Sequence, residues 1–300
     1  MTLFDLIPNA ILLLSDVFSA FKNGRLDAVE QLDAVIAPLQ KAIHAEQDTA
    51  LAAIHLVKSQ SPLKQSIDGA ILATLAAERL GYSTERTHTL IQATLTANFS
   101  FLDMQVLLNI NANKLSDEQF QKIQQHPILS AELLEKNGVS NQHWLDIVLQ
   151  HHERLDGKGY PKQLSQEQVL QEAMIIGLCE FYTSMIEERS YREPKLPKDV
   201  LQMIHKQDNE RPAQLNQTFI RLLGIYPPGT FVQLANKEVA IVTERIPNQV
   251  TPKIKALFDP NQKPYLGALE RDANQDQFKI VKPCQLPGQP SVDLFSIWAQ

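Results

Sequence analysis

The 300-residue sequence has few cysteines, no basic block and no long apolar run, and each absence argues against a class of protein. Cys179 and Cys284 lie far apart in the chain and match no metal or redox spacing, which favours reduced thiols over a disulfide. A net charge of −6 without a Lys/Arg-rich segment gives no nucleic-acid footprint. The apolar run Ala10 to Leu14 is broken by Asp16, which makes it too short to span a membrane. We therefore expect a cytoplasmic protein with no membrane span and no nucleic-acid partner.

Helical periodicity runs through most of the first 224 residues, where apolar side chains recur at spacings of three and four. Ser83, Ser116–Gln119 and Ser165–Gln168 are typical of helix starts, and Gly81 is typical of a helix end. We predict helices within 1–60 and over 63–80, 83–95, 116–126 with a second piece to 136, 140–152, 165–182, 197–205 and 214–223, with breaks at Pro8, Asn23-Gly24 and His126-Pro127.

The pattern changes at Gly224, after which β-branched residues alternate with turn residues. Strands are predicted over 230–235, 238–244, 253–258 and 277–281, the first two joined as a hairpin through Asn236-Lys237. The chain is therefore expected to be mainly α. Its predicted divisions are an N-terminal helical region over 1–60, a helical domain over 61–224 and a small β-module over 225–300.

The most chemically dense segment is His151 to Pro161, which reads His-His-Glu-Arg-Leu-Asp-Gly-Lys-Gly-Tyr-Pro. Glycine and proline end a helix, so the two histidines are expected at the last turn of a helix that opens into a rigid loop. Together with His126 they suggest a metal site, because neutral imidazole binds iron, zinc and manganese. Adjacent histidines also occur at exposed helix ends, and this alternative stays open. Of the other histidines, His44 and His55 are each expected to lie on the surface or between helices. His88 and His143 are expected to be solvated.

The segment from His151 to Pro161 resembles the signature of HD-GYP domains, bacterial hydrolases of cyclic di-GMP. Flanking segments agree with this resemblance. Lys114–Gln119 and His126-Pro127 resemble the family's helix start and its ligand histidine, and Arg189–Arg192 resembles its Arg-Pro-Tyr-Arg element. The resemblance covers about residues 60–224 and implies an HD-GYP-like helical bundle. Tyr226-Pro-Pro-Gly229 resembles the start of an extension that some members carry.

The family's defining His-Asp-x-Gly-Lys motif is missing, since its register falls on residues 97–101. Its histidine, aspartate and lysine become Ala97, Asn98 and Phe101, and an upstream helical histidine of the family becomes Gln65. Asp103 is offset from the motif and is not expected to replace the aspartate. The resemblance therefore carries metal ligands over only to His126, His151, His152 and, in place of an aspartate, Glu180.

These losses argue against a two-metal centre, which needs negatively charged ligands to hold two ions together. Asn98 offers a neutral carbonyl, Ala97 offers no ligand, and Phe99 and Phe101 should make this corner apolar. The expected cofactor is either none or a single divalent ion of iron, manganese or zinc.

Two functional hypotheses follow from the resemblance, and a purely structural scaffold is a third. In the first, a catalytically impaired signalling protein binds regulatory partners, such as GGDEF-type domains, and cyclic di-GMP. In the second, the chain is an active metal-dependent phosphohydrolase with a one-metal site. An N-terminal homodimer is a further expectation. Arg192 is a candidate phosphate contact, and the docking loop is predicted to comprise Glu153, Arg154, Asp156, Gly157, Lys158, Gly159, Tyr160 and Pro161.

Overall fold

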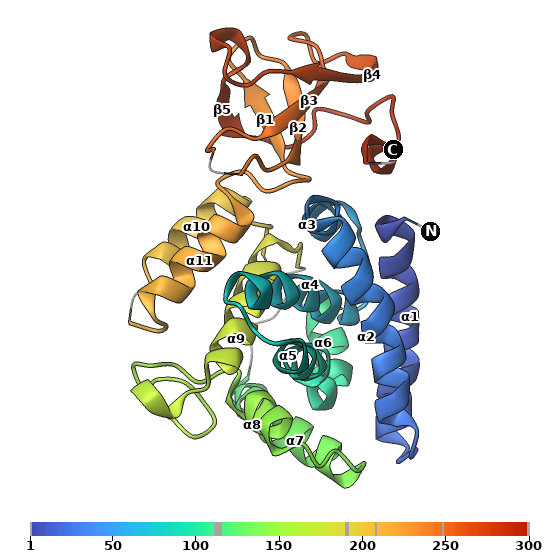
Figure 1. Cartoon of the computed structure of the whole chain (residues 1–300), viewed down its shortest axis with the longest axis vertical. Helices are drawn as coiled ribbons and strands as arrows, with labels where there is room; N and C mark the ends of the chain where they lie inside the picture. The colour runs from blue at the N-terminus through green and yellow to red at the C-terminus, as the bar shows by residue number, and fades with distance from the viewer. Residues whose placement is uncertain (1, 111–115, 190–191, 208, 248, 299–300) are drawn as a thin grey trace.

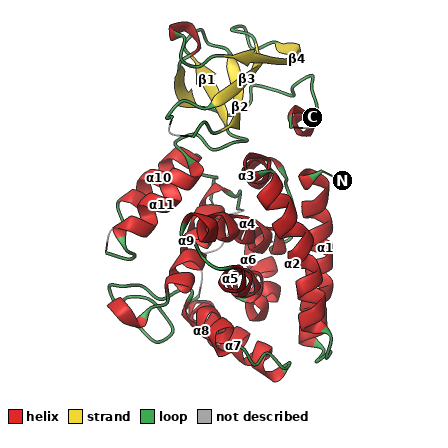
Figure 2. Ribbon diagram, viewed as in Figure 1, coloured by secondary structure: helices red, strands yellow, loops and turns green. Residues whose placement is uncertain are grey.

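The computed structural model describes residues 2–110, 116–189, 192–207, 209–247 and 249–298. A body of helices carries a small antiparallel sheet at one end, and both chain termini lie on the same side of the molecule (Figure 1, Figure 2). The predicted mainly α fold with a C-terminal β-module is confirmed. Lys114 and Leu115, from the segment that resembles the family's helix start, and Tyr191, from the Arg189–Arg192 element, lie outside the described ranges.

Three N-terminal helices form one side of the body: α1 (Leu3–Lys22), α2 (Ala28–Ala45) and α3 (Gln47–Leu56). The predicted break at Pro8 is wrong, because α1 continues through it and begins at a capping box on Thr2. By length and composition α1 is also long and apolar enough to cross a membrane, yet half of that window is buried inside the protein. Two expectations therefore remain predictions: that the chain has no membrane span, and that the protein is cytoplasmic.

Helix α4 (Leu63–Arg79) runs through the middle of the body and is buried on nearly every side. It packs against α5 (Thr84–Thr96), where a Cβ on Gly69 would come within 3.2 Å of Thr94. The short 3₁₀ helix η1 (Phe99–Phe101) and α6 (Leu102–Ile110) follow. Gly81 adopts a φ of +71° after α4 and Ser83 caps α5, as the sequence predicts.

The next helices are α7 (Asp117–Lys136), α8 (Gln142–Gln150), α9 (Gln171–Ile186), α10 (Pro197–His205) and α11 (Ala213–Leu223). Helix α7 begins at the predicted Ser116 capping box but is continuous through Pro127, so the expected break there is wrong. The helix predicted over 140–152 is α8, and its N-cap is Asn141 and not Ser140. The capping box at Ser165 starts only a 3₁₀ turn, η2 (Gln166–Gln168), and α9 begins after Leu170.

The sheet has the strand order β4-β3-β2-β1-β5, with every neighbouring pair antiparallel. Its strands are β1 (Phe231–Leu234), β2 (Val239–Glu244), β3 (Lys253–Phe258), β4 (Pro264–Arg271) and β5 (Ile280–Pro283). The predicted hairpin is the β1–β2 pair, turning at Lys237 with a φ of +74°. Strand β4 was not predicted, since its side chains are half-buried or exposed and give no apolar alternation. The predicted last strand is partly a 3₁₀ turn, η3 (Asp276–Phe278).

The C-terminal segment joins the sheet to the helices. In the 3₁₀ helix η4 (Leu294–Ile297), the Phe295 ring stacks on Phe4 of α1 with centroids 4.6 Å apart. Trp298 packs on the same ring and donates its indole N–H to the Thr243 carbonyl at 3.0 Å. Arg245 also pairs with Asp48 of α3. The sheet is therefore anchored to α1 and α3.

Candidate metal and phosphate site

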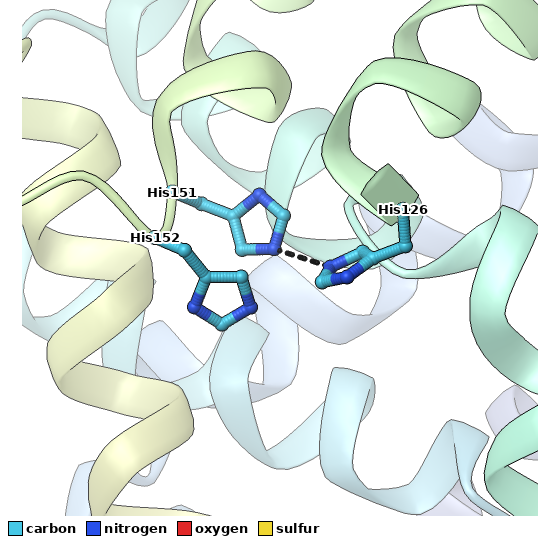
Figure 3. Close-up of side chains that lie close together, drawn as sticks. All are labelled: His126, His151 and His152. Atoms are coloured by element: carbon cyan, nitrogen blue, oxygen red, sulfur yellow. Dashed lines mark hydrogen bonds between the residues drawn. The ribbon is translucent and has the colours of Figure 1, made fainter. Parts of the chain in front are cut away.

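The three predicted ligand histidines line a cavity of about 860 Å³. It lies where the loop after α8 meets the start of η1, the middle of α9 and the segment before α11. Figure 3 shows the three imidazole rings turned toward one another. Their ligand atoms all lie within 4.8 Å of one another, so the structure brings together the histidines that the sequence predicted as a set.

Pro127 determines how His126 is oriented within α7. In a regular helix the amide of residue 127 would donate to the carbonyl of Ile123, but proline has no N–H. That carbonyl instead accepts a hydrogen bond from Nδ1 of His126 at 2.6 Å. The Nδ1 atom must carry the proton, because a carbonyl only accepts. The Nε2 lone pair of the neutral ring is therefore directed into the cavity.

The end of α8 orients His151 in the same way. Because the helix ends at Gln150, the Val148 carbonyl lacks its usual backbone donor and accepts Nδ1–H of His151 at 2.6 Å. Nε2 of His151 then lies 3.0 Å from Nε2 of His126 (Figure 3). The ring of His152 lies 4.1 Å from that of His151, measured between centroids. The prediction that the histidines end a helix and open into a loop is confirmed.

Burial keeps these imidazoles neutral. Desolvation lowers the pKa of His126 to about 3 and that of His151 to about 4. The pKa of His152 falls well below its ordinary value through burial, through the two neighbouring rings and through the charge of Arg211. Two neutral rings with their Nε2 lone pairs directed at each other repel unless a cation lies between them. This donor set therefore fits one divalent ion of the kind that imidazole binds, such as zinc, iron or manganese.

Glu180 extends toward the histidines from α9. Its Oε2 lies 4.0 Å from Nε2 of His151 and 3.7 Å from Nε2 of His152. Its Oε1 accepts a hydrogen bond from the side-chain amide of Asn98. Burial raises the pKa of this carboxyl to about 7, and the amide hydrogen bond opposes that shift. Glu180 is thus placed to act as a fourth ligand, as the resemblance implies.

The opposite wall of the cavity is neutral. Asn98 lines it, while its neighbours Ala97 and Phe99 are buried in the core, where the ring of Phe99 packs edge-on against Phe18 and Phe21 of α1. Phe101 lies with its ring centroid 5.3 Å from that of His126. This agrees with the apolar corner that the sequence predicts.

Two further residues, Gln65 and Asp103, lie on or near this wall, and their hydrogen bonds show whether they could act as metal ligands. Gln65 accepts hydrogen bonds from Arg189 at 2.7 Å and Gln105 at 3.1 Å. Asp103 is exposed and pairs with Lys22 of α1 at 2.6 Å, so its carboxylate is directed away from the histidines. This arrangement agrees with the expectation that Asp103 does not replace the missing aspartate.

The loop after His152 is rigid because its own side chains bind its backbone. The two carboxylate oxygens of Glu153 accept the amides of Lys162 at 2.6 Å and Leu164 at 2.9 Å. Asp156 receives two hydrogen bonds from Arg154 and one from the Lys158 amide. Three of the predicted docking residues, Glu153, Arg154 and Asp156, therefore make hydrogen bonds that stabilise the loop. In these hydrogen bonds they do not bind the histidines, and Nδ1 of His126 and of His151 binds backbone carbonyls.

The glycines of the loop are required by its geometry. Gly157 has a φ of +70°, which other residues rarely adopt. A Cβ on Gly159 would lie 2.5 Å from the backbone of Glu153 and Arg154. This close approach places the Tyr160 ring over His152, with centroids 4.7 Å apart, before a cis peptide bond to Pro161. Lys158 is the exposed charge of the loop.

Four arginines line the cavity, and one of them, Arg211, was missed from the sequence. Nothing in the sequence marks it, because its position depends on how the segment before α11 folds back onto α9. Arg192, the predicted phosphate contact, uses both terminal nitrogens on Ser184 O and Met185 Sδ at the end of α9, and its Nε is buried without a partner among the described residues.

His143 is exposed and His88 partly exposed, as expected of solvated side chains, but each also has a carboxylate partner. His88 Nε2 lies 3.0 Å from Asp33 and His143 Nε2 lies 3.2 Å from Glu172. The partners come from distant helices and have no local sequence signal. His44 pairs with Glu78, and His55 lies between helices against the Tyr182 hydroxyl at 3.3 Å, both as expected.

Comparison with known proteins identifies the family. The family model described as HD domain matches residues 49–212, more than half of the chain. A cyclic di-GMP phosphodiesterase of Pseudomonas aeruginosa is 29% identical over 151 residues, covering 50% of this chain and 36% of the relative. PdeB, a cyclic di-GMP phosphodiesterase of Borreliella burgdorferi, is 24% identical over 180 residues, covering 60% and 47%. The chain thus spans less than half the length of these relatives.

Among solved structures, Bd1817, described as an HDG"Y"P protein from Bdellovibrio bacteriovorus, has a TM-score of 0.61. Its sequence is 17% identical, and the match covers 73% of this chain and 70% of that one. At this identity the likeness shows the fold alone, and the fold agrees with the family model. The chain therefore belongs to the HD domain family.

Proposed function

We propose that this chain is a degenerate HD-GYP signalling protein that binds cyclic di-GMP around at most one divalent metal and does not hydrolyse it efficiently. It would act as a binding and regulatory module. The names of its curated relatives supply the ligand class, since they are cyclic di-GMP phosphodiesterases. Hydrolysis by clustered metals requires two ions about 3.5–4 Å apart, held by charged ligands.

The observation that carries the proposal is the hydrogen bond from Asn98 to Glu180. Asn98 stands where the family has its metal-bridging aspartate, and its amide nitrogen donates to the carboxylate that lies nearest the histidines. One oxygen of Glu180 is therefore occupied by a neutral donor, and the opposite wall supplies no negative charge. Three histidines and one carboxylate oxygen suffice for a single ion only.

The shape and charge of the cavity support ligand binding. Its volume of about 860 Å³ lies within the range of small-molecule sites. It is lined by four arginines and Lys158 against the three carboxylates of Glu153, Glu180 and Glu210, a surplus of positive charge in a protein whose net charge is −6. Arginine binds phosphate oxygens well because its planar donors match their geometry.

The test combines binding and turnover on the full chain. We expect calorimetry to show cyclic di-GMP binding, with no linear product by chromatography after prolonged incubation with manganese or iron. Release of linear product at a rate that His151→Ala abolishes would overturn the proposal. His143→Ala, which changes a histidine outside the cavity, is the matched control.

A one-metal phosphohydrolase is the second candidate, favoured by the 3.0 Å approach of the Nε2 atoms of His126 and His151. Such an enzyme would bind one equivalent of metal tightly and lose turnover on chelation. Metal analysis after purification without chelator separates the two candidates. A metal content below about a tenth of an equivalent per chain would exclude this enzyme, because a structural or catalytic ion held by several ligands stays bound during purification.

The regulatory part of the proposal assigns partner docking to the loop from Glu153 to Pro161. Its internal hydrogen bonds support this role, since a rigid loop loses little entropy on binding. Lys158 is its exposed charge, so Lys158→Glu should weaken binding to an acidic face of a GGDEF-type domain without changing metal content. An unchanged affinity in calorimetry with such a domain would remove Lys158 from the interface.

A further inference from the structure

The four arginines of the cavity differ in how firmly other residues hold them. Arg154 is paired with Asp156 at 2.8 Å and Glu210 at 2.9 Å. Arg189 is paired with Glu187 at 2.7 Å and also donates to Gln65 and Asn109. Arg192 holds the end of α9 through Ser184 and Met185. These three guanidinium groups already have short contacts to groups of the protein.

Arg211 is the least engaged of the four. Its contacts to Gln207 Oε1 at 3.3 Å and Glu210 Oε2 at 3.5 Å are long, and both use Nη1. Within the described part of the chain, Nη2 donates to no acceptor. Yet the residue is only 9% exposed, so a buried guanidinium lines the cavity with donors to spare. Burying an underpaired charge is costly, which points to a missing anion.

Arg211 lies close to Gly177 of α9. A Cβ at position 177 would lie 2.7 Å from the His151 carbonyl and 3.9 Å from Nη2 of Arg211. The missing side chain therefore lets the His151 backbone pack against α9, and the Arg211 guanidinium lies in ordinary contact distance of the same position. Glu180 follows Gly177 by three residues, so both lie on the same face of the helix. Arg211 thus places a positive charge in the cavity beside the face of α9 that carries Glu180.

We propose that Arg211 binds a phosphodiester oxygen of the nucleotide beside the single metal site, and that its charge opposes the entry of a second cation into the cavity. The nucleotide class rests on the proposed function, whereas the opposition to a second cation does not. A guanidinium can hold and neutralise a phosphate as an ion does, but it cannot activate water for attack. The site would therefore bind the ligand with a charge balance near that of a two-metal enzyme while lacking its reactivity.

The first experiment measures cyclic di-GMP binding by calorimetry in the manganese-loaded and chelated full chain. Arg211→Gln should weaken binding about tenfold or more in both states, because it removes a charge-assisted hydrogen bond. Arg211→Lys, which keeps the charge, should recover most of the affinity. Arg86→Gln, which breaks a pair with Glu172 outside the cavity, is the matched control and should leave affinity unchanged. Equal affinity of Arg211→Gln and the wild type would overturn the anion role.

The second experiment counts metal ions and is independent of the nucleotide. Asn98→Asp restores a carboxylate, and we expect this variant still to hold at most one manganese ion. The double variant Asn98→Asp/Arg211→Gln should take up a second ion. If Asn98→Asp alone binds two, or the double variant no more than one, the inference that Arg211 opposes a second cation is wrong. If the wild type fails to bind cyclic di-GMP, the proposed function fails, and the metal count still decides the role of Arg211.

Discussion

The two walls of the cavity differ in the kind of side chain that each presents. On one wall, the backbone of α7 and α8 orients two histidines through carbonyls that lack their usual donors, and Tyr160 covers His152. On the other wall, Asn98 offers a neutral amide and Phe101 an apolar ring, at the positions where the resemblance to HD-GYP domains implies charged residues. The first wall presents imidazole nitrogens in a geometry that suits a metal ion, whereas the second presents apolar packing and neutral hydrogen bonds.

This difference separates binding from catalysis. The first wall can be kept intact by local structure alone, because a proline, a helix end and two glycines orient its side chains. The second wall would need a negative charge opposite Glu180 to hold two ions. The contrast predicts that changes to the neutral wall mainly affect folding, whereas changes to the histidine wall mainly affect metal affinity.

The largest expected effect is on stability, from Phe99→Ala. Phe99 is 1% exposed and packs edge-on against Phe18 and Phe21, so its loss leaves a cavity between η1 and α1. The free energy of unfolding should fall by about 3–5 kcal/mol in urea titrations. Phe120→Ala, at a half-exposed phenylalanine of α7, should change it little. Metal content per folded molecule should stay as in the wild type, and a loss of metal in Phe99→Ala would break the comparison between the walls.

The second effect is on metal affinity, from His151→Ala. It removes one of the two Nε2 atoms that face each other at 3.0 Å. Equilibrium dialysis with zinc or manganese should show a loss of about a hundredfold, since even residues that only support ligands contribute ten- to a hundredfold. His143→Ala should bind as the wild type does. A metal affinity that survives His151→Ala would place the ion elsewhere.

A smaller loss of metal affinity is expected from Pro127→Ala. Alanine restores an amide donor to the Ile123 carbonyl, which then competes with Nδ1 of His126 for that acceptor. The His126 ring loses its fixed orientation, and zinc affinity should fall by about tenfold. Pro38→Ala, at a proline inside α2 and away from the cavity, is the control. If both variants bind zinc equally, Pro127 has no orienting role.

Local signals explain what the sequence could predict of this site. The family-like segment from His151 to Pro161, the His126-Pro127 pair and the capping box at Ser116 each depend on neighbours in the chain, and all three appear in the structure. The same reliance on local signals misled the prediction at Pro8 and Pro127, where proline lies inside continuous helices. Tertiary packing outweighs the lost hydrogen bond there, and a sequence pattern does not report packing.

Contacts between distant segments explain what the sequence could not predict. Arg211 reaches the cavity from the segment before α11, which lies beside α9 in the fold, and His88 and His143 meet carboxylates of distant helices. Strand β4 pairs with β3 through its backbone while its side chains remain largely exposed. None of these has a spacing in the sequence that distinguishes it from a surface residue or a loop.

The smallest expected effect tests a buried carboxylate near the neutral wall. Asp68 lies three residues after Gln65 on α4 but lines a second cavity of about 960 Å³, which shares Arg189 and Asn109 with the first. Burial raises the pKa of Asp68 to about 7, although its partner Lys64 opposes the shift. The folded state then binds more protons than the unfolded state between about pH 4 and pH 7, so the contribution of Asp68 to stability decreases as the pH rises through this range.

Asp68→Asn should remove that contribution, which we expect to be about 1 kcal/mol because Lys64 offsets much of the burial. The measurement is the free energy of unfolding in urea at several pH values between 5 and 7.5, with chelator present. The pH slope is decisive, and not the absolute stability, because Lys64 loses its partner in the variant. The buried histidines, including His55 beside Asp68 and Lys58, oppose the trend in both proteins, since their lowered pKa values make folding more favourable as the pH rises. Stability should therefore rise more steeply with pH in Asp68→Asn than in the wild type. Equal slopes would mean that Asp68 stays charged throughout, and that the side of the molecule behind the neutral wall holds a permanent ion pair.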